Sequence, residues 1–169
     1  MGVCSYLCEC YTLFMQGIII YATHTGNTYM VSKTILEEVS SQMPLLMKKA
    51  KDVVREDLDD ASVLLIGSSS WDWQGNRGYP IDEMMKFLDS MGEVDLSGKK
   101  IMLFGCGDRD YEHFCGALDV IGEKVRERGG QIMGEPLRVD KYYLNEAENK
   151  KLVVEWCESV RQKIKSFEE

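Results

Sequence analysis

Residues 18–28 read Ile-Ile-Ile-Tyr-Ala-Thr-His-Thr-Gly-Asn-Thr, an apolar, β-branched run that passes directly into a short polar stretch. Two further apolar runs follow, Val-Leu-Leu-Ile at 63–66 and Ile-Met-Leu-Phe at 101–104. Apolar side chains at consecutive positions indicate strands that are buried on both faces, as in a parallel sheet. We therefore predict three buried parallel strands at these runs.

Between the runs, apolar residues recur at the spacing of a helix. This spacing predicts helices over about 31–39, 81–91, 117–125 and 145–167, and weaker strand signals lie near 45–50 and 131–139. Strands that alternate with helices form right-handed crossovers, which place helices on both faces of one parallel sheet. The predicted fold class is α/β, doubly wound, with five strands in a single domain.

Composition limits the function classes. The 169-residue chain carries a formal net charge of −8, which argues against nucleic acid as its main partner. No apolar run approaches the length of a membrane-spanning helix, so we expect no membrane partner.

Residues 1–14 contain Cys4, Cys8 and Cys10 but no second set of ligands at metal spacing. We expect these residues to be a poorly ordered extension and expect no metal site.

The polar stretch Thr23-His24-Thr25-Gly26-Asn27-Thr28 follows the first strand and precedes a helix. Hydroxyl groups and free backbone N–H groups at a helix N-terminus favour an anion, and a phosphate monoester is the natural ligand. The stretch lacks the Gly-Lys-Ser/Thr ending of a nucleotide-binding P-loop. The alternative interpretation is a capped turn rich in Ser and Thr, with no ligand.

Two more loops follow the third and fourth strands. Residues 67–75 contain Ser68, Ser69 and Ser70, which can complete a phosphate site, and Trp71, which can stack on a flat ring or cover the sheet. Residues 105–115 contain glycines that allow close backbone approach and Tyr111 as a second aromatic face. Trp73 is interpreted as a packing or rim residue, and His113 as a surface helix residue. Cys106 and Cys115 are interpreted as packing residues because they lack a Cys-x-x-Cys spacing.

These three loops, in this order, resemble the flavin-binding loops of flavodoxins. The matching motifs are Thr23-x-Thr25-Gly26-Asn27-Thr28, Ser69-Ser70-Trp71 and Gly107-Asp108-x-x-Tyr111-x-x-Phe114-Cys115-Gly116-Ala117. The resemblance covers residues 15–169 and implies a flavodoxin-like sheet with strand order 2-1-3-4-5. There is little room for an insertion between Gln131 and Asp140, so the chain resembles the short-chain type.

The resemblance also implies a cofactor and its binding residues. Thr23 to Thr28 with Ser69 would hold the phosphate of FMN, Trp71 and Tyr111 would enclose the isoalloxazine ring, and Asp108 would lie at its pyrimidine edge, where its charge lowers the potential of the bound flavin. The full set of expected FMN-binding residues is Thr23, His24, Thr25, Gly26, Asn27, Thr28, Ser69, Ser70, Trp71, Asp72, Cys106, Gly107, Asp108, Tyr111, Phe114 and Cys115.

The function implied is a low-potential, cytoplasmic, monomeric electron carrier rather than an enzyme, passing single electrons between redox proteins with basic surfaces. One alternative is an FMN-dependent NAD(P)H or quinone oxidoreductase on the same fold, which would need a pocket for a second substrate. A phosphoacceptor receiver domain is a further alternative, but it requires acidic residues where Thr23 to Thr28 and Ser68 to Ser70 stand.

Removal of residues 1–14 should leave flavin affinity and melting temperature nearly unchanged. The deletion removes one charge, that of Glu9. Thermal and chemical unfolding of the two proteins would measure the effect. A loss of more than about 2 kcal/mol in the free energy of unfolding, the scale of one large buried apolar side chain, would mean that the segment packs on the core.

Asp72 stands where short-chain flavodoxins most often have glycine after the aromatic residue, and in the family the peptide there turns when the flavin gains one electron. A non-glycine residue pays roughly 1–2 kcal/mol in the left-handed conformation. Asp72→Gly should therefore raise the potential of the first reduction step by roughly 40–90 mV, since about 59 mV corresponds to a tenfold change for one electron. A redox titration in which the glycine variant has an equal or lower potential would contradict this.

Overall fold

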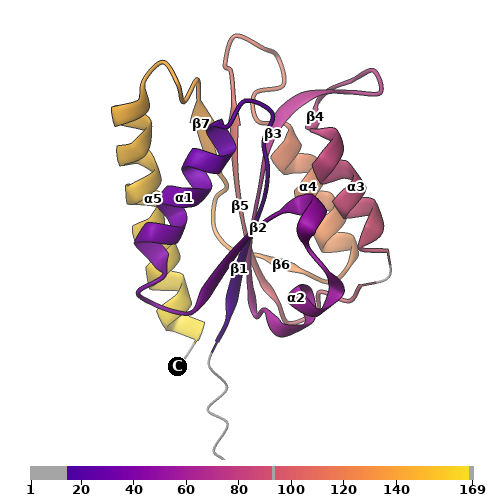
Figure 1. Ribbon diagram of the computed structural model, residues 1–169, viewed down its shortest axis with the longest axis vertical. Coiled ribbons are helices and arrows are strands. Elements are labelled where there is room, and N and C mark those ends of the chain that lie inside the picture. The colour runs from indigo at the N-terminus through magenta and orange to yellow at the C-terminus, as the bar shows by residue number, and fades with distance from the viewer. Residues whose placement is uncertain (1–14, 93, 168–169) are drawn as a thin grey trace, which may run out of the picture.

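The computed structural model describes residues 15–92 and 94–167, and it has one sheet between two layers of helices (Figure 1). Strand β1 (Gly17–Ala22) is buried at every position. It lies between β2 (Leu45–Lys49) and β3 (Val63–Trp73), and pairs in parallel with both. The residues of the first apolar run thus form an inner strand of the sheet.

The sheet continues beyond β3 in the order β2-β1-β3-β5-β6. Strand β5 (Lys100–Gly107) pairs in parallel with β3, and it also pairs in parallel with two short strands, β6 (Gln131–Ile132) and β7 (Leu137–Asp140). Strand β4 (Asn76–Pro80) pairs antiparallel with the end of β3. The five expected parallel strands are present in the predicted order 2-1-3-4-5, with the fifth in two parts.

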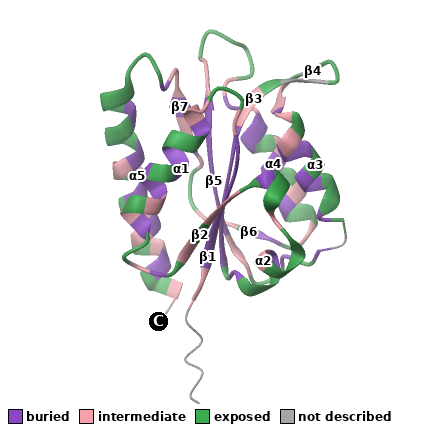
Figure 2. Cartoon of the chain, in the orientation of Figure 1, coloured by how far each residue is buried: buried purple, intermediate pink, exposed green. Residues whose placement is uncertain are grey.

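Helices cover both faces of the sheet, and the core is divided accordingly into two clusters (Figure 2). On one face of the sheet, Ile19 and the residues of the adjacent strands that point the same way pack against α1 (Asn27–Val39) and α5 (Glu146–Phe167). Ile18 and Ile20 face α3 (Asp82–Ser90) and α4 (Ala117–Glu127). The short helix α2 (Arg55–Asp60) lies on this second face, after a 3₁₀ turn at Ala50–Asp52.

Three parts of the fold differ from the prediction. The fifth strand is interrupted between Ile132 and Leu137, where Gly134 has a φ of 73° and Pro136 has no N–H to donate. Residues 67–73 are not a loop, because β3 continues to Trp73 and turns back through a hairpin. That turn contains Gly75 at a φ of 82°. The short elements α2 and β4 were not predicted, since neither is long enough to show a period.

The parallel register brings the ends of the strands to one edge. Ala22 pairs with Ser68, Ser69 with Cys106, and Gly107 with Asp140. The segments that follow β1, β5 and β7 and the β3–β4 hairpin therefore emerge together. This is the edge at which doubly wound α/β proteins bind ligands.

No helix in the described ranges is both long enough and apolar enough to span a bilayer. The expectation for residues 1–14, including Cys4, Cys8 and Cys10, falls outside the described residues.

The Asp57 side chain fixes the start of α2. Its carboxylate accepts hydrogen bonds from the Lys48 amine at 2.7 and 2.8 Å and from the Val54 N–H at 2.9 Å. Burial raises the pKa of Asp57, but the bonds from Lys48 and Val54 outweigh it, so the pKa of this carboxyl is lowered. The ionised form is therefore favoured by folding.

We expect Asp57→Asn to lower the free energy of unfolding by about 1 kcal/mol at pH 7, the scale of a lost helix cap. A carboxyl whose pKa is lowered by folding stabilises the protein above its unfolded pKa and loses this effect as the pH falls. The difference between the two proteins should shrink below about pH 4. Denaturant titrations at several pH values would measure it. Asp59→Asn, whose exposed carboxylate pairs with Arg55, is a matched control with little expected loss.

Candidate functional site

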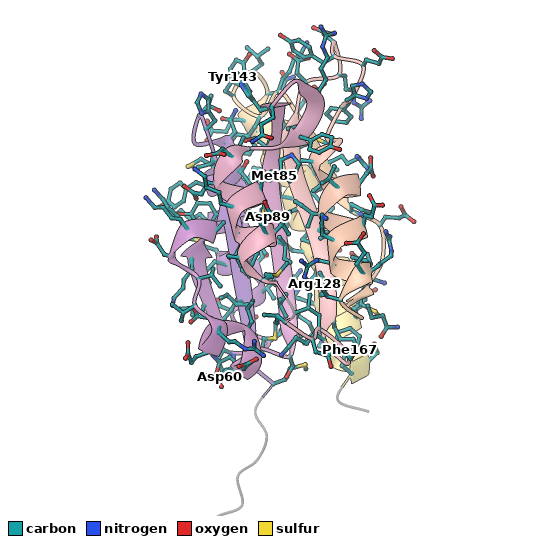
Figure 3. The ribbon with its side chains drawn as sticks, turned by 90° about the vertical axis from the view of Figure 1, so that its right-hand side faces the viewer. Asp60, Met85, Asp89, Arg128, Tyr143 and Phe167 are labelled. Atoms are coloured by element: carbon teal, nitrogen blue, oxygen red, sulfur yellow. The ribbon has the colours of Figure 1, made fainter. Side chains whose placement is uncertain are left out.

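A cavity of about 650 Å³ lies at the carboxyl edge of the strands. This volume is in the range of small-molecule and cofactor sites. Four segments far apart in the sequence contribute to its wall, and Figure 3 shows one of the wall residues, Tyr143, at the end of the molecule opposite Asp60 and Phe167. The wall residues are His24, Thr25, Asn27, Ser69, Ser70, Trp71, Arg77, Gly78, Cys106, Gly107, Asp108, Tyr111, Glu112, His113, Cys115, Lys141 and Tyr143.

The turn between β1 and α1 is shaped for close approach of a ligand to the backbone. Gly26 has a φ of 91°, a left-handed conformation that favours glycine, and its N–H donates to the Thr23 hydroxyl at 3.0 Å. The first turn of α1 has no acidic residue, and no side chain caps the helix. The first N–H groups of a helix have no intrahelical partner, so this turn offers donors to an anion. A turn closed by its own helix cap, the alternative interpretation of this stretch, does not fit.

The Ser69 hydroxyl is a buried polar group whose hydrogen-bonding capacity is unsatisfied by the described residues. Its hydroxyl oxygen is buried and makes no hydrogen bond with any residue of the described chain. Ser69 also lies on the cavity wall. An unpaired buried hydroxyl costs free energy unless a ligand or solvent satisfies it. The neighbouring Ser70 differs, because its hydroxyl accepts a hydrogen bond from the Ala117 N–H at 3.1 Å at the start of α4.

Two aromatic side chains stand at the mouth of the cavity. Trp71 is 54% exposed and Tyr111 is 72% exposed, although both are large and largely apolar. The His24 ring lies against Trp71, with ring centroids 5.0 Å apart. Exposed aromatic faces on opposite segments of one cavity suit a flat ring system that enters between them.

The segment after β5 approaches the cavity through its backbone. A Cβ at Gly107 would lie 3.0 Å from the Cys115 nitrogen, so a side chain there would crowd the backbone of Cys115. Cys115 has a φ of 53°, and the Arg138 guanidinium donates to its carbonyl at 2.9 Å. Burial raises the pKa of Cys106 and of Cys115 to about 12 each. Both thiols are therefore protonated at neutral pH, in line with packing rather than redox chemistry.

The wall contains residues that the sequence did not predict: Arg77, Gly78, Glu112, His113, Lys141 and Tyr143. Arg77 and Gly78 belong to the unpredicted strand β4, and Lys141 and Tyr143 follow β7. His113 was expected on a surface helix, but it lies in a turn, since α4 begins only at Ala117. The one sequence signal for Lys141 was its position directly after the end of an expected strand.

Among the predicted residues whose side chains the structure describes, four do not line the cavity: Thr23, Gly26, Thr28 and Phe114. Thr23 and Gly26 instead shape the β1–α1 turn, and Thr28 is fully buried with its side chain against the Cys106 thiol. Phe114 is covered by the guanidinium of Arg109, which lies 5.2 Å from the ring centroid. The backbone of Asp72 lies in β3 between Trp71 and Trp73, where the pairing with β4 is irregular. The side chains of Asp72 and Trp73 are outside the described part of the structure.

Fold and site together define a doubly wound α/β protein with a cavity at the carboxyl edge of its sheet. The family model described as Flavodoxin matches residues 19–156. A flavodoxin of Maridesulfovibrio salexigens is 34% identical over 128 residues, which cover 74% of this chain and 86% of the relative. The chain therefore belongs to the flavodoxin family.

Solved structures show the same fold. Oxidised flavodoxin 2 from Bacillus cereus superposes with a TM-score of 0.77 at 25% identity, covering 88% of this chain and 99% of the other. A Fusobacterium nucleatum flavodoxin, solved bound to flavin mononucleotide, has a TM-score of 0.75 at 19% identity and covers 88% of this chain and 98% of its own. The predicted family and fold class are confirmed.

Proposed function

We propose that the cavity binds FMN without a covalent bond and that the protein carries single electrons between redox proteins. The observation that carries the proposal is the cavity itself, which combines a helix N-terminus, a buried unpaired serine hydroxyl and two exposed aromatic rings in a member of the flavodoxin family. FMN, when bound, supplies the one-electron chemistry. Neither the family nor the relatives favour the NAD(P)H or quinone oxidoreductase alternative.

The residues of the β1–α1 turn and Ser69 are suited to the phosphate. The N–H groups at the start of α1 point their positive dipoles toward an anion, and the side chains of Thr25, Asn27 and Ser69 add donors on the same wall. Bonds from neutral donors to a phosphate oxygen are charge-assisted, which makes them stronger than ordinary hydrogen bonds. We assign the phosphate to this end of the cavity.

The aromatic rings and the β5–α4 segment are suited to the isoalloxazine. Trp71 and Tyr111 would cover its faces and exclude water, while the backbone around Gly107 and Asp108 would lie along its polar edge. Protonated thiols at Cys106 and Cys115 add no charge to this environment. The remaining predicted residues, Thr23, Gly26, Thr28, Asp72 and Phe114, act in the proposal through the shape of these loops.

The open mouth of the cavity is the route for electrons. Electron transfer needs only a brief approach of the partner to the exposed edge of the ring, so a short-lived contact is sufficient. We propose that the protein acts as a monomer in the cytoplasm and that its net charge of −8 steers it toward redox partners with basic surfaces.

Mixing the protein with FMN should produce a yellow complex with a perturbed flavin absorption spectrum and quenched fluorescence. FMN should bind far more tightly than riboflavin, because the phosphate bonds contribute roughly 1.5–3 kcal/mol each. Ser69→Ala removes one such bond and should therefore weaken FMN binding by about 10- to 100-fold. Riboflavin has no phosphate, so its binding should be nearly unchanged. Fluorescence titration with both flavins would measure the four dissociation constants.

Ser70→Ala is the matched control. It removes the acceptor for the Ala117 N–H, so it should lower the stability of the flavin-free protein, whereas Ser69→Ala removes an unpaired buried hydroxyl and should not. A colourless preparation that takes up no FMN would contradict the proposed function. Equal affinity for FMN and riboflavin would contradict the phosphate assignment alone.

A further inference from the structure

Lys141 occupies an unusual place on the cavity wall. It directly follows β7, and its N–H donates to the Gly107 carbonyl at 2.9 Å, one step beyond the last pair of the β5–β7 ladder. Its φ of 42° is left-handed, a conformation that a lysine rarely adopts. With the backbone in this conformation, the Lys141 side chain lines the cavity.

The Lys141 amine is paired with two carboxylates of one loop. It lies 3.3 Å from the Asp108 carboxylate and donates a short hydrogen bond to Asp110. The Lys141 side chain is 22% exposed, whereas that of Asp110 is 77% exposed. The Lys141 side chain is therefore less exposed than that of Asp110, and it lines the cavity together with Asp108. Hydrogen bonds to Asp110 and then Asp108 raise the pKa of Lys141, so the amine is charged at neutral pH.

The loop is also held by hydrogen bonds that do not involve this amine. The Arg109 N–H donates to the Asp140 carboxylate at 3.0 Å, and the Tyr111 N–H donates to the Asp108 carbonyl at 3.1 Å. Neither bond, nor the bond from the Lys141 N–H, uses the lysine side chain. Electrostatic and structural roles of Lys141 can therefore be separated by substitution.

We propose that Lys141 raises the affinity of the cavity for reduced FMN relative to oxidised FMN, and so sets the reduction potential of the bound flavin. The inference rests on the proposed function. Reduction adds negative charge to the ring, and an ammonium on the wall of a partly enclosed cavity attracts that charge more strongly than it would in water. Without Lys141, the carboxylates of Asp108, on the cavity wall, and of Asp110 would lose the cation that pairs with them.

The test compares Lys141→Gln with the unmodified protein by redox titration and by the dissociation constant of oxidised FMN. The affinity for reduced FMN should fall about three- to tenfold more than the affinity for oxidised FMN. The ring gains its negative charge in the second one-electron step, so this ratio corresponds to a potential for that step lower by roughly 30–60 mV. Lys141→Arg keeps the charge and should restore the original potential.

Two further variants complete the design. Lys165→Gln makes the same change of net charge on an exposed residue near the far end of α5 and should not shift the potential. Asp110→Asn removes a carboxylate that pairs with Lys141 and should raise the potential, the opposite direction. It also provides a test if Lys141→Gln does not fold.

The outcomes separate the two claims. If Lys141 only positioned the loop, both affinities would fall equally and the potential would not change, which would overturn the inference. An unchanged potential in Asp110→Asn would also overturn the inference. Failure of every form of the protein to bind FMN would overturn the proposed function and the inference together, whereas normal FMN binding with an unchanged potential would overturn the inference alone.

Discussion

The parallel pairing of β1, β3 and β5 is the constraint on which the rest of the molecule depends. Each of these strands is apolar at consecutive positions, so both of its faces must be covered by helices. A shift of register by one residue would exchange the side chains of the two core clusters. Because the pairing is parallel, it also places all the carboxyl ends at one edge. The same packing that stabilises the protein therefore assembles its cavity.

The cost of the site is concentrated at that edge. Gly26, Cys115 and Lys141 have positive φ angles there, and the Ser69 hydroxyl is buried without a partner in the described residues. Such features persist only where the surrounding structure holds them in place. Here the strands end in ladders that continue to the cavity, and the Arg138 side chain fixes the Cys115 carbonyl. A stable core thus supports local conformations that are unfavourable alone.

The sequence predicted the parts of the site that lie next to long apolar runs. Residues 23–28, 69–71 and 106–115 each adjoin a strand that its composition makes recognisable. Arg77 was not predicted, because it belongs to β4, which is short and has little signal of its own. Lys141 follows β7, which was expected, but nothing in the sequence shows that the residue after this strand reaches the cavity. Their proximity to the cavity depends on pairing with β3 and β5, which is a property of the folded chain.

Charge acts on two length scales in this molecule. In the proposed function, the net charge of −8 would steer the approach of partners over distances comparable with the Debye length, and salt would screen it. The potential of a ring in the cavity depends instead on the few charges at its wall. The family resemblance placed Asp108 at the pyrimidine edge, where its charge should lower this potential; in the structure, its carboxylate lies 3.3 Å from the Lys141 amine. The surface charge proposed to steer partners and the local charge proposed to set the potential can therefore be changed independently.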